Sequence, residues 1–160
     1  MEKCENKLTV FGEERDLNIF KKSVFSEQVL VFERILPMPR DLERTYSQSI
    51  KEDKEFLHGL KKKYGHDDWY SWRIEKWGTS GNVLPGTSSL KIEHKDQIKL
   101  IYEFDTAWDP PVGVIKEASK IFPLLLFKLR YERWMSFIEG IIIFYNSEDI
   151  LEVTRDYESG

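Results

Sequence analysis

An alternating run near the middle of the chain constrains its fold more than any other feature. Every second residue of the run Ile98–Asp105 is apolar, namely Ile98, Leu100, Tyr102 and Phe104. Because successive side chains of a strand point to opposite faces, the run predicts a strand with one buried and one exposed face. Two other segments, 111–122 and 13–25, place apolar residues at helical spacing.

The remaining segments predict a regular order of strands and helices. We expect strands at 8–11, 29–35, 72–77, 89–94, 98–105, 125–133 and 136–145, and helices at 13–25 and 111–122. A helix that crosses between strands in each half, with hairpins between, is the pattern of a split βαβ sandwich. We therefore predict an α+β, ferredoxin-like fold, with a mostly antiparallel sheet and two helices on one face.

The length of 160 residues indicates one domain, spanning 1–160. Within it we expect a helical insertion over about 40–66, ending at Gly65 as a C-terminal glycine cap. We expect a weakly ordered tail over about 146–160, although Ile150, Leu151 and Val153 could add an edge strand.

Composition narrows the class of protein. Hydrophobic residues make up 41% of the chain, and the net charge is −4 with both signs mixed. A core of ordinary size is therefore expected, and the charge balance does not favour nucleic acid. The lone cysteine, Cys4, cannot form an internal disulfide. We predict a cytoplasmic protein with no membrane segment; the sequence does not predict an oligomeric state.

Four short motifs, in this order, resemble those of one family. They are Asn6-Lys7-Leu8-Thr9-Val10, Ile35-Leu36-Pro37-Met38-Pro39, Trp72-Arg73-Ile74-Glu75-Lys76-Trp77-Gly78-Thr79 and Phe104-Asp105-Thr106-Ala107-Trp108-Asp109-Pro110-Pro111. Together they resemble the Api92-like, or YubB-like, proteins of phages, prophages and plasmids. The resemblance implies a ferredoxin-like domain of unknown function over roughly Cys4 to Tyr145, and a mobile-element origin. It implies no catalytic residues.

The chain departs from the family pattern at two places. Ser80-Gly81-Asn82 follows the Gly-Thr pair, where the family commonly has a basic residue, a tryptophan and an aspartate. Tyr131-Glu132-Arg133-Trp134 keeps only an outline of the late Tyr-x-Glu motif. The resemblance therefore describes a divergent member.

Metal, cofactor and catalytic motifs are not apparent in the sequence. Cys4 and the three histidines lack paired ligand spacing, and no phosphate-binding loop or nucleophile elbow is present. Asp105 and Asp109 stay open to two interpretations. They could converge as acid and base or hold a cation, or Asp109 could cap the helix that follows it. We favour the cap.

The tryptophans are the most suggestive residues. If 72–77 is a strand, Trp72 and Trp77 face opposite sides, and Arg73 shares the face of Trp77. That face could resemble the stacking platform of an RNA-binding domain, or the insertion could fold over it and bury it. We favour burial. Trp108 is not needed by a helix cap, so it either plugs the core or marks the rim of a binding surface.

These arguments predict a non-enzymatic module that binds a macromolecule, with a protein as the favoured partner and inhibition of a host protein as one role. Single-stranded nucleic-acid binding and a small enzyme using Asp105 and Asp109 are the alternatives. The candidate binding surface comprises Arg73, Trp77, Gly78, Thr79, Asp105, Trp108 and Asp109.

Overall fold

The computed structural model describes residues 1–45 and 53–157. Its main element is a six-stranded sheet in the order β4-β5-β1-β6-β7-β8, with every neighbouring pair antiparallel. The strands are β1 (Lys3–Phe11), β4 (Ser89–Glu93), β5 (Lys99–Ala107), β6 (Leu126–Arg133), β7 (Ile138–Tyr145) and β8 (Glu148–Asp156). The helices that the structure describes are α1 (Glu14–Val24), α3 (Lys54–Tyr64), α4 (Trp69–Lys76) and α5 (Val112–Ile121).

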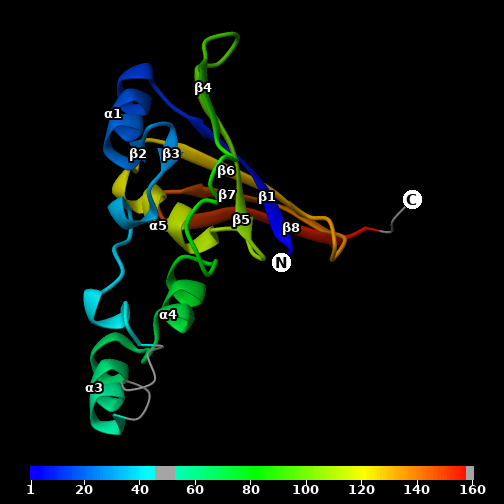
Figure 1. The fold of residues 1–160 in the computed structure, drawn as a ribbon. Coiled ribbons are helices and arrows are strands. Elements are labelled where there is room, and N and C mark those ends of the chain that lie inside the picture. The colour runs from blue at the N-terminus through cyan, green and yellow to red at the C-terminus, as the bar shows by residue number, and fades with distance from the viewer. Residues whose placement is uncertain (46–52, 158–160) are drawn as a thin grey trace.

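The first four strands of that order form the ferredoxin-like core. β1 lies between β5 and β6, so β1 and β4 run parallel to each other with β5 inserted between them. This is the split βαβ arrangement that the sequence predicted, and the prediction of the fold class is confirmed. Figure 1 shows α1 and α5 beside this sheet, with α3 and α4 reaching away from it.

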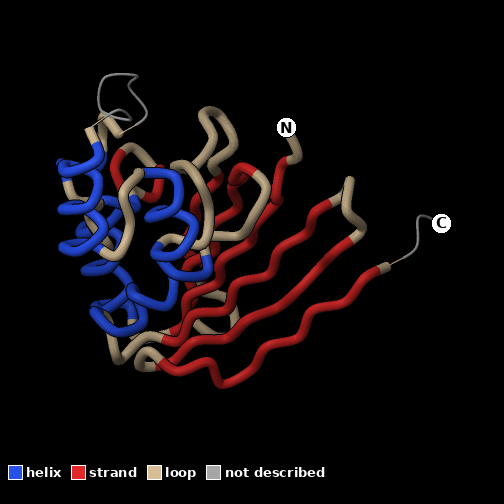
Figure 2. The backbone as a smooth tube through the Cα atoms, turned by 90° about the horizontal axis from the view of Figure 1, so that it is seen from below, coloured by secondary structure: helices blue, strands red, loops and turns tan. Residues whose placement is uncertain are grey.

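One face of the sheet packs against helices, and the other carries none of the helices that the structure describes. Alternate residues of β1 are buried, namely Cys4, Asn6, Leu8 and Val10. On α1 the buried residues are Leu17, Phe20 and Val24. Figure 2 shows the helices gathered on one side of the strands. The uncovered side is called the open face here.

The hairpin β7–β8 extends the sheet beyond the ferredoxin-like core. Residues 148–156, where we expected a weakly ordered tail with an optional edge strand, form β8 and pair with β7 along its length. The register shifts between Ile143 and Phe144, which leaves Ile150 without a partner on β7. β8 is therefore the edge strand of the sheet, and all of its residues are exposed.

The strand predicted at 29–35 is wrong. Only Val29–Leu30 is extended, as β3, and it pairs with β2 (Phe25–Ser26) in a small separate hairpin. The turn between them holds Glu27 and Gln28 at positive φ, and a 3₁₀ helix at Phe32–Arg34 follows. The second strand of a split βαβ unit pairs with β5, and in this sheet β4 occupies that position.

The strand predicted at 72–77 is also wrong, because this segment is helix α4. Asp68 caps it: its carboxylate accepts hydrogen bonds from the backbone N–H of Ser71 at 2.7 Å and from the Ser71 hydroxyl at 2.9 Å. The Asp-x-x-Ser spacing is a helix-start signal. It outweighs the β-propensity of the tryptophans, which is a preference for half-buried surfaces rather than a property of the backbone.

Candidate functional site

Trp77 and Thr79 are structural residues rather than surface ones. Trp77 is 0% exposed, packs edge-on against Phe32 and Trp72, and donates its indole N–H to the carbonyl of Leu36 at 2.8 Å. Both Trp72 and Trp77 are buried and their rings are in contact, so the prediction that they face opposite sides of a strand is wrong. Thr79, also 0% exposed, donates its hydroxyl to the carbonyl of Ala107 at 2.8 Å.

Two glycines join α4 to the start of α5. A Cβ on Gly113 would lie 2.0 Å from the carbonyl oxygen of Lys76, and one on Gly78 would lie 2.8 Å from the N–H nitrogen of Val112. Gly78 also has φ +91°, a conformation that L-residues rarely adopt. The backbones therefore touch directly, and Val114 N–H donates to the carbonyl of Trp77 at 3.2 Å.

Arg73 lies beside aromatic rings instead of on a sheet. Its guanidinium carbon is 4.8 Å from the ring centre of Trp69 and 4.9 Å from that of Trp77. It also donates to the carbonyl of Ser80 at 3.3 Å. Burial lowers the pKa of Arg73, and the charge of Glu33 opposes that effect. Because Arg73 lies in α4 and Trp77 is the C-cap residue of that helix, the stacking platform proposed for them on the sheet does not exist.

Asp105 and Asp109 do not converge. Asp105 is paired in register with Glu5 on the open face, and burial together with the charge of Glu5 raises its pKa. Asp109 instead points to Arg133, with 3.4 Å between Oδ1 and Nη1, on the opposite side of the sheet. The shared acid–base site is therefore ruled out for these two residues.

The N-cap predicted for Asp109 is wrong as well. Helix α5 begins at Val112, its N-cap is Pro111, and no side chain bonds to its first amides. The proline pair remains at the start of the helix, where a missing N–H costs little. Asp109 lies before the first turn of α5, and its carboxylate accepts a hydrogen bond from Arg133 instead of from the helix amides.

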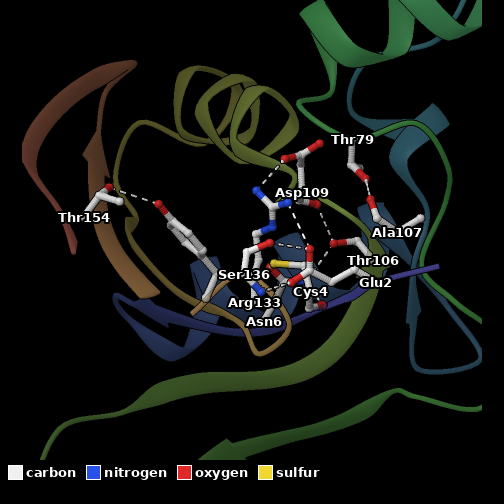
Figure 3. A network of polar contacts seen from close by, with 11 residues as sticks. Glu2, Cys4, Asn6, Thr79, Thr106, Ala107, Asp109, Arg133, Ser136 and Thr154 are labelled. Carbon is white, nitrogen blue, oxygen red and sulfur yellow. Dashed lines mark hydrogen bonds and ion pairs between the residues drawn. The ribbon is translucent and has the colours of Figure 1, made fainter. Parts of the chain in front are cut away.

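Asp109 belongs to a polar cluster that the sequence did not reveal (Figure 3). Its centre is Glu2, which is 3% exposed. The Glu2 carboxylate accepts hydrogen bonds from Arg133 Nη2 at 3.0 Å and from the N–H and hydroxyl of Ser136, both at 2.8 Å. Its backbone carbonyl accepts from the N–H of Trp108 at 2.9 Å.

The electrostatics of this cluster favour the charged pair. Burial alone would raise the pKa of Glu2, but the hydrogen bonds from Ser136 and Arg133 and the charge of Arg133 hold the pKa below its usual value. Glu2 is the second residue of the sequence and lies 131 positions from Arg133. No local sequence signal could have predicted the pair.

Cys4 and Asn6 continue the cluster into the core. The Asn6 amide donates to the carbonyl of Cys4 at 3.1 Å and to the hydroxyl of Thr106 at 3.0 Å. Thr106 in turn donates to the carbonyl of Asp109 at 2.7 Å. Burial raises the pKa of the Cys4 thiol to about 12, so it remains protonated at neutral pH. The arrangement therefore fastens β1 to the end of β5 and offers no nucleophile.

Trp108 does not plug the core. It is 47% exposed and has φ +65°, and it follows directly after the carbonyl that Thr79 binds. Of the seven predicted surface residues, Gly78, Thr79, Trp108 and Asp109 thus gather around the end of β5. Arg73 and Trp77 support this junction from α4 and its C-cap, and Asp105 faces away from it.

An exposed apolar area lies elsewhere, on the open face of β7 and β8. We call it the apolar stripe and define it as Ile141, Ile143, Tyr145, Leu151 and Val153. Cross-strand pairing sets Ile141 opposite Val153 and Ile143 opposite Leu151. Tyr145, Leu151 and Val153 are 43%, 45% and 51% exposed. Such contiguous apolar side chains mark an interaction surface more often than isolated ones do.

The sequence contained the signal for this stripe. The run Ile141-Ile142-Ile143 is apolar at both odd and even positions, as expected for a strand covered on both faces. The structure covers only the face of Ile142 and Phe144, which are 3% and 0% exposed. The other apolar residues of the run, Ile141 and Ile143, lie on the open face.

Comparisons with known proteins agree with this geometry. Residues 89–160 match the family model described as "Ferredoxin-like domain in Api92-like protein". This segment runs from β4 to the C-terminus and includes both strands of the apolar stripe. The sheet and this match together show that the protein has a ferredoxin-like α+β fold.

Residues 89–160 are thus similar to the ferredoxin-like domain of Api92-like proteins, and the resemblance seen in the sequence is confirmed. The crystal structure of a protein api92 from Yersinia pseudotuberculosis matches with a TM-score of 0.58 and 10% identity, covering 100% of this chain and 99% of that one. At this identity the match shows a shared fold. No curated protein matches the chain.

Within residues 1–45 and 53–157, no three His, Cys, Asp or Glu side chains lie close enough together to hold a metal ion. None of the helices that the structure describes is long and apolar enough to cross a membrane.

Proposed function

We propose that this protein is a non-enzymatic module that binds another protein through the apolar stripe. The observation that carries the proposal is the exposure of Tyr145, Leu151 and Val153 on two paired strands without a covering helix. Complete burial of an exposed Leu or Val side chain is worth roughly 1.5–3 kcal/mol, and side chains that are 43–51% exposed would gain about half of that on being covered. A partner that covers the stripe gains this energy, and the isolated chain does not.

The edges of the stripe suit a protein partner. Glu139 and Arg155 border one end of the stripe, opposite each other in register and joined as an ion pair. Glu148 lies at the other end, opposite Tyr145. An apolar centre with a polar rim is the usual composition of a protein interface. β8 is also an edge strand, and its outer backbone groups can pair with an extended segment of the partner.

The biological setting of the proposal comes from family resemblance and not from geometry. The motifs shared with Api92-like proteins imply a phage, prophage or plasmid origin. An accessory protein of a mobile element that binds a host protein can act by inhibiting it, and we include this role in the proposal. It is tested by identifying the partner and assaying its activity with and without the purified chain.

The binding proposal is tested by affinity purification from host lysate with three forms of the protein. Leu151→Asp/Val153→Asp places charge in the stripe, whereas Ile19→Asp changes a residue of α1 that is 51% exposed and lies in the helical layer. We expect the wild type and Ile19→Asp to retain the same partner, and the double variant to retain at least about tenfold less.

The partner so found is then purified and titrated against the three forms. Equal affinity of all three forms would refute the proposal, as would a partner that only Ile19→Asp fails to bind. Circular dichroism of the double variant establishes that its sheet is intact. Size-exclusion chromatography identifies the case in which the partner is a second copy of the chain.

A further inference from the structure

A group of cations lies on the open face next to the apolar stripe, over the centre of the sheet. Lys7 and Thr9 of β1, Lys99 and Ile101 of β5, and Lys128 and Arg130 of β6 surround a hollow of about 170 Å³, together with Phe11. We call it the basic hollow. Ile101, which is 8% exposed, is its buried apolar member.

The cations of the basic hollow are not neutralised within it. Among the described residues, no ion pair joins Lys7, Lys99, Lys128 or Arg130 to a carboxylate. The nearest acidic positions in register are Glu103, opposite Lys7, and Glu93, opposite Lys99. Neither of them lines the hollow. A chain with net charge −4 thus concentrates four positive charges at one place.

The register sets two like charges against each other on the β6 side of β1, whereas on the β5 side Lys7 lies opposite Glu103. Lys7 lies directly opposite Arg130 on neighbouring strands, and Lys128 is one pair away on the same face. Like charges directly opposite each other destabilise a sheet, whereas opposite charges or polar residues would not. An anion bound in the hollow would offset the repulsion between these positive side chains.

An aromatic ring lies within the same hollow. Phe11 is in register with Lys99 on one side and with Leu126 on the other, and it is partly exposed. Cations that track a phosphate backbone, beside aromatic rings on which bases stack, are the two elements of single-strand recognition.

We infer that the basic hollow binds the sugar–phosphate backbone of a single-stranded nucleic acid, with a base stacked on Phe11. The site differs from the surface expected around Arg73 and Trp77, which the structure places in α4 and at its C-cap. It is also separate from the apolar stripe, so a protein partner and a nucleic acid contact different side chains of one sheet. Loss of either activity leaves the other measurable.

The test is a titration of the full chain against a fluorescein-labelled oligothymidylate of about 15 nucleotides, followed by fluorescence anisotropy at several salt concentrations. Lys7→Gln/Lys128→Gln/Arg130→Gln removes three charges from the hollow. The matched control, Lys22→Gln/Lys62→Gln/Lys120→Gln, removes three exposed lysines from α1, α3 and α5 and changes the net charge equally.

We expect the hollow variant to bind more than tenfold more weakly at about 50 mM salt, and its salt dependence to fall by about two in the slope of log affinity against log salt. The control variant should bind within about threefold of the wild type. Phe11→Leu keeps an apolar side chain without the ring, and we expect a loss of about tenfold from the missing stack.

Three outcomes would overturn the inference. One is no binding by the wild type at low salt, and another is an equal loss in the hollow and control variants, which would indicate charge alone. The third is equally tight binding of a labelled polyglutamate of the same charge, which would assign the hollow to acidic protein segments. Retained binding by Leu151→Asp/Val153→Asp supports the separation of the two surfaces.

Discussion

At the scale of single residues, the pair of Glu2 and Arg133 shows how a charge near the chain terminus is held. Three hydrogen-bond donors converge on the Glu2 carboxylate, and together they outweigh the cost of its burial. Its folded-state pKa lies below the ordinary value of 4.5. The charged carboxylate therefore stabilises the fold above that pH, and the contribution is lost as the pH falls through the folded-state pKa.

Glu2→Gln should consequently be destabilising in a pH-dependent way. We expect the free energy of unfolding in urea to fall by about 2 kcal/mol at pH near 7, because hydrogen bonds to a charged group are lost. The difference from the wild type should shrink as both are measured below about pH 4.5. Glu27→Gln removes the same charge from the exposed turn between β2 and β3 and serves as the control. A difference that stays constant with pH would contradict this account.

At the scale of elements, the contact between α4 and α5 depends on the absence of a side chain. A methyl group at Gly113 would meet the backbone oxygen of Lys76 at 2.0 Å, and backbone cannot rotate away. Gly59 in α3 has nothing within 4 Å of the same position. Gly59 in α3 and Gly113 in α5 are thus two helical glycines that can be compared: a Cβ would meet open space at the first and backbone atoms at the second.

We expect Gly113→Ala to destabilise the protein by about 2 kcal/mol through overpacking. Gly59→Ala should stabilise it by about 0.5–1 kcal/mol, since alanine has the higher helix propensity. Thermal or urea unfolding followed by circular dichroism measures both. Equal effects of the two substitutions would mean that α4 does not pack against α5 as described.

The same scale shows which elements the sequence could predict. The alternation at 98–105 and the helical spacing at 111–122 led directly to β5 and α5, because long periodic segments record their buried face. The strand predicted at 72–77 failed because aromatic content was given more weight than the Asp68 cap. The strand predicted at 29–35 failed because β4 takes the position beside β5, and no local pattern indicates which segment pairs there.

The candidate site was predicted less well than the fold, for a related reason. Trp77, Gly78 and Thr79 do lie next to the end of β5, as their grouping with Trp108 implied. However, Glu2 and Arg133 come together only through the pairing of β1 with β6. The basic hollow likewise combines three strands that are distant in sequence. Contacts of this kind follow from topology and register, which the sequence pattern specified only in outline.

At the scale of the whole molecule, the sheet divides the protein into a helical face that makes the core and an open face that carries the exposed surfaces (Figure 2). The ferredoxin-like core is complete at β6, so β7 and β8 are not required to close it. They extend the sheet and supply most of the exposed apolar residues on the open face. A hairpin that the core does not require, and that carries exposed apolar residues, supports the proposal that β7 and β8 form a binding element.

Photo-crosslinking from neighbouring residues of β8 tests that claim most directly. Val153 belongs to the apolar stripe, whereas Glu152 is in register with the buried Ile142 and points to the other side of the strand. A benzophenone amino acid is placed at one position or the other, and the protein is illuminated with its purified partner. We predict crosslinks to the partner from position 153 and few from position 152. Equal crosslinking from both positions, or crosslinking from 152 alone, would contradict binding through the open face.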